Sequence, residues 1–321
     1  MPDSQTAPRN ILLLSGGSKV AIANIAKQAA KRRGLELHIS DTSSQVPTFA
    51  IADHFTQLPE HKSPYWADEL KKLCFEAKIR LIIPTRHSEL LELSKLVPSL
   101  SQNGTVVSLS EPKTLTSCIH KLDTYHFLRS IGIPTPTSCL RSEFDNQIEF
   151  PLIAKPERGS SSNGATIISS QRELKELPAD WLLQEKAEGT EYTVNVYLSK
   201  TGRALCAIPH ERIIVEAGEV VQAKTRRHQK LIEACVQIAE QLPGASGIIN
   251  IQAFVDETAN QISVIEINPR IGGGYPLCDA AKGHYIEWLC QEHIDNKEVA
   301  PFVQWTENLL MMRYREAMFS L

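Results

Sequence analysis

Short apolar runs alternate with longer amphipathic stretches along the N-terminal third of the chain. A short apolar run bounded by turn residues is typical of a buried strand, whereas apolar positions three and four apart are typical of a helix. This pattern predicts strands at residues 10–15, 35–40 and 81–84, and an alanine-rich helix at 19–33 that Gly34 ends. Because strands that alternate with helices form parallel sheets, we expect an α/β parallel-sheet domain over residues 1–112.

The pattern changes in the rest of the chain. A helix is predicted at 111–131, where Gly132 and the proline-containing segment after it end the helix. Apolar runs joined by turns then predict strands at 152–155, 165–169, 181–186, 192–198, 204–209, 248–255 and 262–267, with helices at 171–177 and 228–242. Strand pairs with few helices indicate an α+β fold instead of a second parallel sheet.

Composition and net charge exclude several classes of protein. A length of 321 residues with 42% hydrophobic and 22% charged positions fits two or three domains with their own cores. The formal net charge of −3 gives no bulk attraction to nucleic acid or to a membrane surface. Seven scattered cysteines without a Cys-x-x-Cys pair indicate free thiols. Residues 1–10 lack a signal-peptide core and no apolar run could span a bilayer, so we expect a cytoplasmic protein.

The most informative stretch is 262–274, Ile-Ser-Val-Ile-Glu-Ile-Asn-Pro-Arg-Ile-Gly-Gly-Gly. Glu266 and Asn268 lie two apart on a predicted strand, so both project from one face, and a carboxylate with an amide oxygen suits Mg²⁺. Across the predicted hairpin Gln252 falls opposite residue 265, and it reaches the same face only if a bulge or a longer turn shifts the register by one. A strand end that carries polar residues into a loop would have the same spacing, so the pattern alone leaves both interpretations open.

A second motif is 151–166, Pro-Leu-Ile-Ala-Lys-Pro-Glu-Arg-Gly-Ser-Ser-Ser-Asn-Gly-Ala-Thr. Lys155 at a strand end, followed by a Gly/Ser loop, places an ammonium beside several backbone N–H groups, which suits phosphate oxygens. Gly159 and Gly164 have P-loop spacing, but Ala165 and Thr166 replace the Lys-Ser/Thr pair and a strand follows, which excludes a Walker site. A plain hairpin loop would show the same residues.

Two weaker features complete the set. At 183–194 a strand turns at Gly189, where backbone groups can pair with a purine edge and Glu191 can accept hydrogen bonds from ribose hydroxyls. A solvated polar turn explains this segment equally well. Gly16-Gly17 after the first strand, with Asp41 ending the second, is similar to a dinucleotide-binding start, but the full Gly-x-Gly-x-x-Gly is absent and a tight strand-to-helix turn is the favoured interpretation.

Taken in order, these segments resemble the ATP-grasp superfamily, particularly the branch that includes the halves of the carbamoyl phosphate synthetase large subunit and the pyrrolysine-biosynthesis ligase. The similarity extends over about residues 10–315 and is densest at 119–136, 151–166, 184–196 and 247–274. The resemblance implies a Rossmann-like domain at 1–112 that helps to hold the substrate. It also implies an ATP-grasp domain at 113–321, whose lobes at 113–186 and 187–321 clamp ATP.

The resemblance implies a role for each motif residue. Lys121 and Lys155 would contact the nucleotide phosphates, and Arg270 would steady the transferred phosphoryl group and the acceptor. The loop closing over the phosphates would include Arg158, Gly159, Ser160, Ser161 and Ser162. The adenine hinge would be Gln184, Glu185, Lys186 and Ala187, with Glu191 on the ribose. The metal ligands would be Gln252, Glu266 and Asn268.

The resemblance further implies an ADP-forming carboxylate-amine ligase that uses ATP and Mg²⁺. A substrate carboxylate would attack the γ-phosphorus to give an acyl phosphate, and an amine would displace phosphate to form an amide. The expected partners are a small-molecule carboxylate and a small-molecule amine, and we expect binding to neither nucleic acid nor a membrane. A homodimer stays open. Two alternatives stay open, namely an ATP-dependent carboxylase or phosphotransferase on the same scaffold, and a protein that binds ATP without turnover.

Two positions depart from the family pattern. His120 precedes Lys121 where the family often has an acid, and Arg86-His87 stands in a substrate-side loop where related proteins more often have acidic or small residues. The second departure suggests an anionic acceptor. The chain is also too short to contain both synthetase halves, so we do not expect carbamoyl phosphate synthesis by this chain alone.

Overall fold

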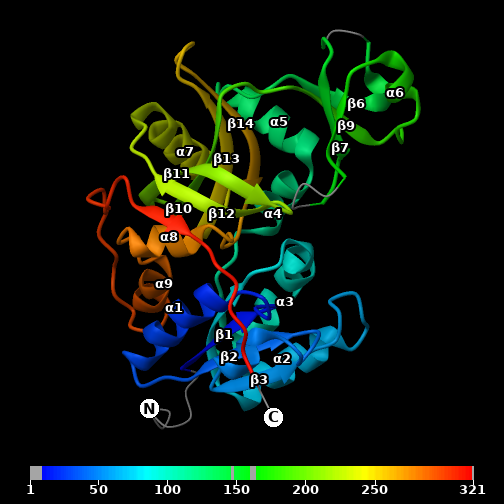
Figure 1. The fold of residues 1–321 in the computed structure, drawn as a ribbon. Coiled ribbons are helices and arrows are strands. Elements are labelled where there is room, and N and C mark those ends of the chain that lie inside the picture. The colour runs from blue at the N-terminus through cyan, green and yellow to red at the C-terminus, as the bar shows by residue number, and fades with distance from the viewer. Residues whose placement is uncertain (1–8, 146–147, 160–163, 320–321) are drawn as a thin grey trace.

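The computed structural model describes residues 9–145, 148–159 and 164–319, which form three sheets (Figure 1). The N-terminal sheet is parallel, in the order β3-β2-β1-β4-β5, as the alternating pattern predicts. Its strands are β1 (Asn10–Leu14), β2 (Leu37–Asp41), β3 (His54–Gln57), β4 (Ile79–Pro84) and β5 (Val106–Val107). Its helices are α1 (Val20–Lys31), α2 (Trp66–Glu76) and α3 (Leu90–Gln102), with 3-10 turns η1 (Pro47–Ala50) and η2 (His87–Glu89).

The single helix predicted at 111–131 is wrong, because the chain forms two helices there. α4 (Pro112–Ile119) and α5 (Lys121–Ser130) are separated by His120, whose backbone is extended with φ −86° and ψ 110°. The backbone N–H of Lys121 then donates to the carbonyl of Glu157 at 3.3 Å. Apolar periodicity continues through a break of one residue, so the pattern does not reveal this turn toward the loop after Lys155.

The first lobe contains a four-stranded sheet in the order β6-β9-β7-β8. Its strands are β6 (Ser138–Leu140), β7 (Leu152–Pro156), β8 (Thr166–Ile168) and β9 (Trp181–Glu185), with the turn η3 (Arg141–Glu143) and helix α6 (Gln171–Lys175) beside them. The Ser170 hydroxyl caps α6 by accepting a hydrogen bond from the N–H of Glu173. Leu152, Ala154 and Leu183 have no exposed surface and centre this small core.

The second lobe contains a six-stranded antiparallel sheet in the order β14-β13-β10-β11-β12-β15. Its strands are β10 (Thr190–Leu198), β11 (Ala204–Glu216), β12 (Glu219–Thr225), β13 (Gly247–Asp256), β14 (Gln261–Asn268) and β15 (Leu310–Met312). Helix α7 (Gln229–Gln241) packs on one face, while α8 (Tyr275–Ala280) and α9 (Tyr285–His293) lie toward the N-terminal domain (Figure 1). The strand predicted at 204–209 is longer than expected and continues to Glu216. The apolar pattern did not predict β12, α8 or α9.

One apolar cluster joins the N-terminal domain to the second lobe. Helix α1 packs against α8 and α9, with Ala26 and Ala30 on one side and Tyr275 and Leu289 on the other, all fully buried. Small alanine side chains allow this close approach, and the aromatic ring of Tyr275 packs into the same cluster. The two walls of any cavity between these parts are thus held by a common core. Within the described residues no helix combines the length and hydropathy that crossing a membrane requires.

Candidate active site

A cavity of about 300 Å³ lies between the first-lobe sheet and strands β13 and β14 of the second lobe. Its lining contains every described residue that the resemblance assigned to nucleotide binding, together with two of the three predicted metal ligands. These are Lys121, Lys155, Arg158, Gly159, Gln184, Glu185, Lys186, Ala187, Glu191, Gln252 and Glu266. Ser160, Ser161 and Ser162 lie outside the described residues.

Two lysines enter this nucleotide cavity from different elements. Lys155 on β7 donates to the Gln184 Oε1 atom at 3.0 Å, and Lys121 at the start of α5 donates to the carbonyls of Pro156 and Gly159 at 3.0 and 2.9 Å. Burial lowers the pKa of Lys155 to about 8, against the negative charge of Glu266. Burial also lowers the pKa of Lys121. Cationic groups with so little solvation are well placed to gain from an anionic ligand.

Residues next to Lys121 tie α5 to the loop after β7. The His120 Nδ1 atom lies 3.2 Å from the Glu157 carboxylate, which also lies 3.6 Å from the Nε atom of Arg158. The histidine at this position thus contacts an acid in the loop after β7. The Arg158 side chain is 73% exposed, so it is free to reach a bound molecule.

The turn predicted to contact the purine is tight. Gly189 has φ +101°, and a Cβ atom there would lie 2.2 Å from the carbonyl oxygen of Val255 on β13. Beyond it, Glu191 forms an ion pair with Arg212, whose Nε atom is 3.0 Å from the carboxylate. Arg212 also donates to Thr193 at 3.4 Å. The assignment of Glu191 to a ribose stays a prediction, and Arg212 is a partner that the sequence did not suggest.

Polar side chains cross the second-lobe sheet in two adjacent rows. A register shift between Gln252 and Ala253 brings Gln252 opposite Glu266, so the bulge needed to place both on one face is present. Thr193 pairs with Gln252 on the other side. In the next row Asn250 lies between Asn195 and Asn268. The apolar end of this face is covered by α8 and α9, whereas Thr193, Asn250 and Gln252 at the polar end line a cavity.

The predicted metal ligands fit a hard cation. Asn268 donates through Nδ2 to the Glu266 Oε1 atom at 2.9 Å. The buried Asn268 Oδ1 atom makes no hydrogen bond of standard geometry, although the His87 ring lies close enough to interact with this side chain. The Oδ1 atom of neighbouring Asn250 is unpaired as well. Buried carbonyl oxygens are seldom left unsatisfied unless a ligand completes them. A carboxylate and amide oxygens form the donor set that Mg²⁺ accepts.

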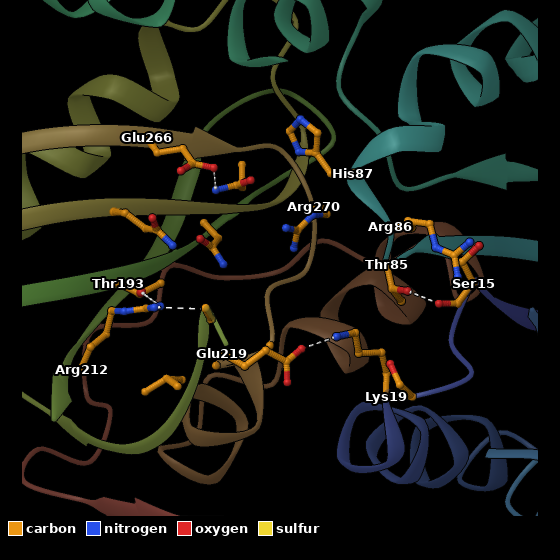
Figure 2. A pocket seen from close by; sticks show the side chains of 18 residues that line it. Ser15, Lys19, Thr85, Arg86, His87, Thr193, Arg212, Glu219, Glu266 and Arg270 are labelled. Carbon is orange, nitrogen blue, oxygen red and sulfur yellow. Dashed lines mark hydrogen bonds and ion pairs between the residues drawn. The ribbon is translucent and has the colours of Figure 1, made fainter. Parts of the chain in front are cut away.

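A second cavity, of about 240 Å³, adjoins the first and lies between the second lobe and the N-terminal domain (Figure 2). Gln252 and Glu266 line both cavities, so the two meet at the predicted metal ligands. Lining residues that the sequence analysis did not single out are Ser15, Ser18, Lys19, Thr85, Thr193, Arg212, Gly218, Glu219, Val220 and Asn250. We call this the acceptor cavity.

Arg270 and His87 both line the acceptor cavity and lie near each other there (Figure 2). The Arg270 Nη1 atom donates to the carbonyl of Ile271 at 3.0 Å, while its Nε atom is buried and unpaired. Neither ring nitrogen of His87 makes a hydrogen bond of standard geometry. Burial together with the charge of Arg270 lowers the pKa of His87 to about 4, against the opposing effects of Glu266 and the nearby Asn268 side chain. His87 is therefore neutral at physiological pH. Arg86 beside it is bound to Asp41 at 3.1 Å.

The Gly16-Gly17 turn is stabilised by hydrogen bonds within the protein. Asp41 accepts a hydrogen bond from the N–H of Gly17 at 2.8 Å and another from that of Thr42 at 2.7 Å. A Cβ atom on Gly17 would lie 2.6 Å from the Asp41 carboxylate. This agrees with the tight strand-to-helix turn favoured above, because the carboxylate that a dinucleotide ribose would need is already occupied.

Family models match most of the chain. A model described as an ATP-grasp domain matches residues 118–274, and one described as a PylC-like N-terminal domain matches residues 11–108. The 3-methyl-D-ornithine--L-lysine ligase of Methanosarcina mazei is 26% identical over 196 residues, which cover 61% of this chain and 48% of that protein. The carbamoyl phosphate synthase large chain of Acidobacterium capsulatum is 27% identical, over 49% of this chain and 17% of that one. The chain thus spans about half the length, or less, of these curated relatives.

Solved structures share the fold over most of the chain. The biotin carboxylase domain of Hydrogenobacter thermophilus 2-oxoglutarate carboxylase, a complex with MgADP and bicarbonate, has a TM-score of 0.76 at 16% identity and covers 94% of this chain and 73% of that one. The L-amino acid ligase of Bacillus licheniformis has a TM-score of 0.68 at 15% identity and covers 89% of this chain and 74% of that one. At this identity the likeness establishes the fold.

Proposed function

The chain belongs to the ATP-grasp family, and on that premise we propose that it is an ADP-forming ligase that activates a carboxylate as an acyl phosphate and joins it to an amine. The observation that carries the proposal is the meeting of the two cavities at Gln252 and Glu266. A cationic nucleotide cavity and a separate acceptor cavity with one shared boundary suit a transfer between two bound molecules.

The chain's own residues would supply charge and position. Lys121 and Lys155 would bind phosphate oxygens, and Arg270 would stabilise the negative charge of the transferred group from the acceptor side. Glu266, Asn268 and Gln252 would hold Mg²⁺, which neutralises phosphate charge in such sites. No side-chain nucleophile is needed, because the substrate carboxylate attacks phosphorus.

Amino acids are the substrate class to test first. The name of the M. mazei relative pairs a methylated D-ornithine with L-lysine, and the B. licheniformis structure is an L-amino acid ligase. The experiment is a screen for ADP release with Mg-ATP and amino acids or small carboxylates, alone and in pairs, beginning with D-ornithine and L-lysine. Product that requires one carboxylate and one amine supports the ligase. ATP binding without any substrate-stimulated ADP release would contradict it.

One observation favours a second candidate. The H. thermophilus neighbour binds bicarbonate on the same fold, so bicarbonate could replace an organic carboxylate as the group activated by ATP. The same screen separates the two, because a carboxylase releases ADP in response to bicarbonate with one further substrate. A ligase responds to an organic carboxylate in bicarbonate-free buffer.

A further inference from the structure

A buried carboxyl group lies directly behind the acceptor cavity. Glu89, the last residue of η2, is 1% exposed and does not line that cavity. Its Oε2 atom accepts a hydrogen bond from the Ser15 hydroxyl at 2.6 Å. Its buried Oε1 atom makes no hydrogen bond of standard geometry, although the backbone N–H of Arg86 lies close enough to favour the carboxylate. Ser15 lines the acceptor cavity and its hydroxyl contacts Glu89, so this residue lies between Glu89 and that space.

The backbone holds Ser15 in an unusual conformation for this purpose. Ser15 follows β1 with φ +55°, a left-handed conformation that costs a non-glycine residue free energy. Thr85 secures it by donating from Oγ1 to the Ser15 carbonyl at 2.6 Å (Figure 2). Glycine would adopt the turn without strain but would leave no hydroxyl between Glu89 and the acceptor cavity.

The surroundings of Glu89 keep its proton exchangeable near neutral pH. Burial raises the pKa of Glu89 to about 7, and the charge of Asp41 acts in the same direction. The Ser15 hydrogen bond and Arg86 oppose this shift. A small cavity of about 10 Å³ beside Glu89 is also lined by Asp41, Arg86 and His61, which are the other titratable or charged groups on its wall.

We propose that Ser15 and Glu89 form a proton relay that deprotonates the amine substrate in the acceptor cavity. This inference rests on the proposed ligase function. The substrate ammonium gives one proton to the Ser15 oxygen as the Ser15 hydroxyl proton passes to the Glu89 carboxylate. The neutral amine then forms the C–N bond at the acyl phosphate carbon, the C–O bond to phosphate breaks, phosphate leaves with the electron pair, and the second proton of the nitrogen passes to the departing phosphate. Glu89 is a positioning residue that acts through Ser15.

The relay predicts a difference between two nucleophiles. Hydroxylamine is largely neutral at pH 7, whereas the L-lysine side chain, with a reference pKa of about 10.4, must lose a proton first. With D-ornithine and Mg-ATP, Glu89→Gln should lower the ratio of amide to hydroxamate by about 100-fold, within the usual range for general base catalysis. It should also remove the rise of the amide-forming rate through pH 7. Gln keeps an acceptor for Ser15, so a purely structural role would leave the ratio unchanged and overturn the relay.

A matched variant and a measurement without turnover complete the test. Glu92→Gln makes the same change on the exposed surface of α3 and should leave the ratio unaltered. Infrared difference spectra at pH 6 should contain a protonated carboxyl band that is lost in Glu89→Gln. L-lysine or n-butylamine should diminish this band in the wild type, because a bound ammonium favours the carboxylate, and should do so far less in Ser15→Ala. A band insensitive to both amines overturns the relay even in an active ligase. Absence of ADP release with every carboxylate and amine of the screen instead overturns the proposed function.

Discussion

Glu266 couples the two cavities through its charge. Its carboxylate lines both cavities, accepts a hydrogen bond from Asn268, and raises the pKa of Lys121, Lys155 and Arg270 against the effect of burial. Its negative charge thus favours the charged forms of three poorly solvated cations, together with Glu157 at Lys121 and Glu219 at Arg270. It follows that Glu266 stabilises the site as well as offering oxygen atoms to a metal.

Replacing the predicted metal ligands should abolish turnover and preserve the fold. We expect Glu266→Ala and Asn268→Ala each to lower the rate of ADP release by at least about 100-fold, because charge on the transferring phosphate would lose its counter-charge. Asn268 is 2% exposed, so its loss should also cost about 1 kcal/mol of unfolding free energy through the broken bond to Glu266. Steady-state kinetics measure the rate of ADP release, and urea unfolding measures the free energy of unfolding.

The control is Glu257→Ala in the exposed turn between β13 and β14. Near-normal activity at saturating Mg²⁺ would remove a residue from the ligand set.

Lys155 should make nucleotide affinity depend on pH. Its pKa of about 8 means that it carries a charge at pH 7 and loses it as the pH rises to 9. Because a bound triphosphate favours the charged lysine, the dissociation constant for ATP should rise up to about tenfold between these pH values. Calorimetric titrations at both pH values test this, with Lys155→Met as the reference that should bind weakly at either pH. Equal pH dependence in both proteins would assign the effect to another group.

The position of a residue in the two cavities was predictable only where a motif included that residue. The residues around Lys155 and Glu266 stood in recognisable order along the chain, and the fold brings them to adjacent cavities. The sequence did not predict that Arg212, Glu219 and Asn250 line the acceptor cavity. Each is an ordinary polar residue on a strand, and its place in the cavity depends on neighbours far away in the sequence. Glu219, for example, binds Lys19 of the N-terminal domain at 2.6 Å. Periodicity describes one element and says nothing about such pairs.

At the scale of elements, a β-bulge and a helix break determine which side chains lie close together. The bulge in the β13–β14 hairpin aligns Gln252 with Glu266, and the extended His120 between α4 and α5 directs Lys121 to the loop after β7. The need for the bulge could be stated from the sequence, because side chains alternate along a strand. Its presence could not, since the turn length that fixes register is set by the folded hairpin. The helix break was missed for a similar reason.

Gly189→Ala should disturb the turn that enters β10. The new Cβ atom would lie 2.2 Å from the Val255 carbonyl oxygen at φ +101°, so the backbone must move. We expect a loss of at least about 2 kcal/mol in unfolding free energy, and weaker ATP binding. Gly202→Ala is the matched control, since its φ is +79° but its nearest neighbour would be 3.5 Å away. It should lose about 1 kcal/mol. Equal losses in the two variants would show that the contact with Val255 is unimportant. Urea unfolding and calorimetry provide the comparison.

At the scale of the whole molecule, the cores explain how the two cavities differ. One apolar cluster spans the N-terminal domain and the second lobe, so the walls of the acceptor cavity belong to a single packed unit. The first lobe has a separate core around Leu152 and Leu183, and the nucleotide cavity lies between it and the second lobe. The parallel sheet and the α+β lobes could be predicted, because period and order specify them. The shared core could not, because α8 and α9 were not recognised and α1 packs against both.

The arrangement of charge across the molecule predicts the products. Lys121 and Lys155 line the nucleotide cavity, and Arg270 stands on the acceptor side of Glu266, which places positive charge where a γ-phosphoryl group would pass between cavities. With its carboxylate present, the protein should release ADP and phosphate, and hydroxylamine should capture the acyl phosphate as a hydroxamate without any amine.

Arg270→Ala should lower the hydroxamate yield at least about 100-fold while weakening ATP binding far less, because the guanidinium is on the acceptor side. Arg129→Ala on the exposed face of α5 is the control. AMP as the stoichiometric product would refute the acyl-phosphate route, and ADP without hydroxamate would favour direct phosphotransfer.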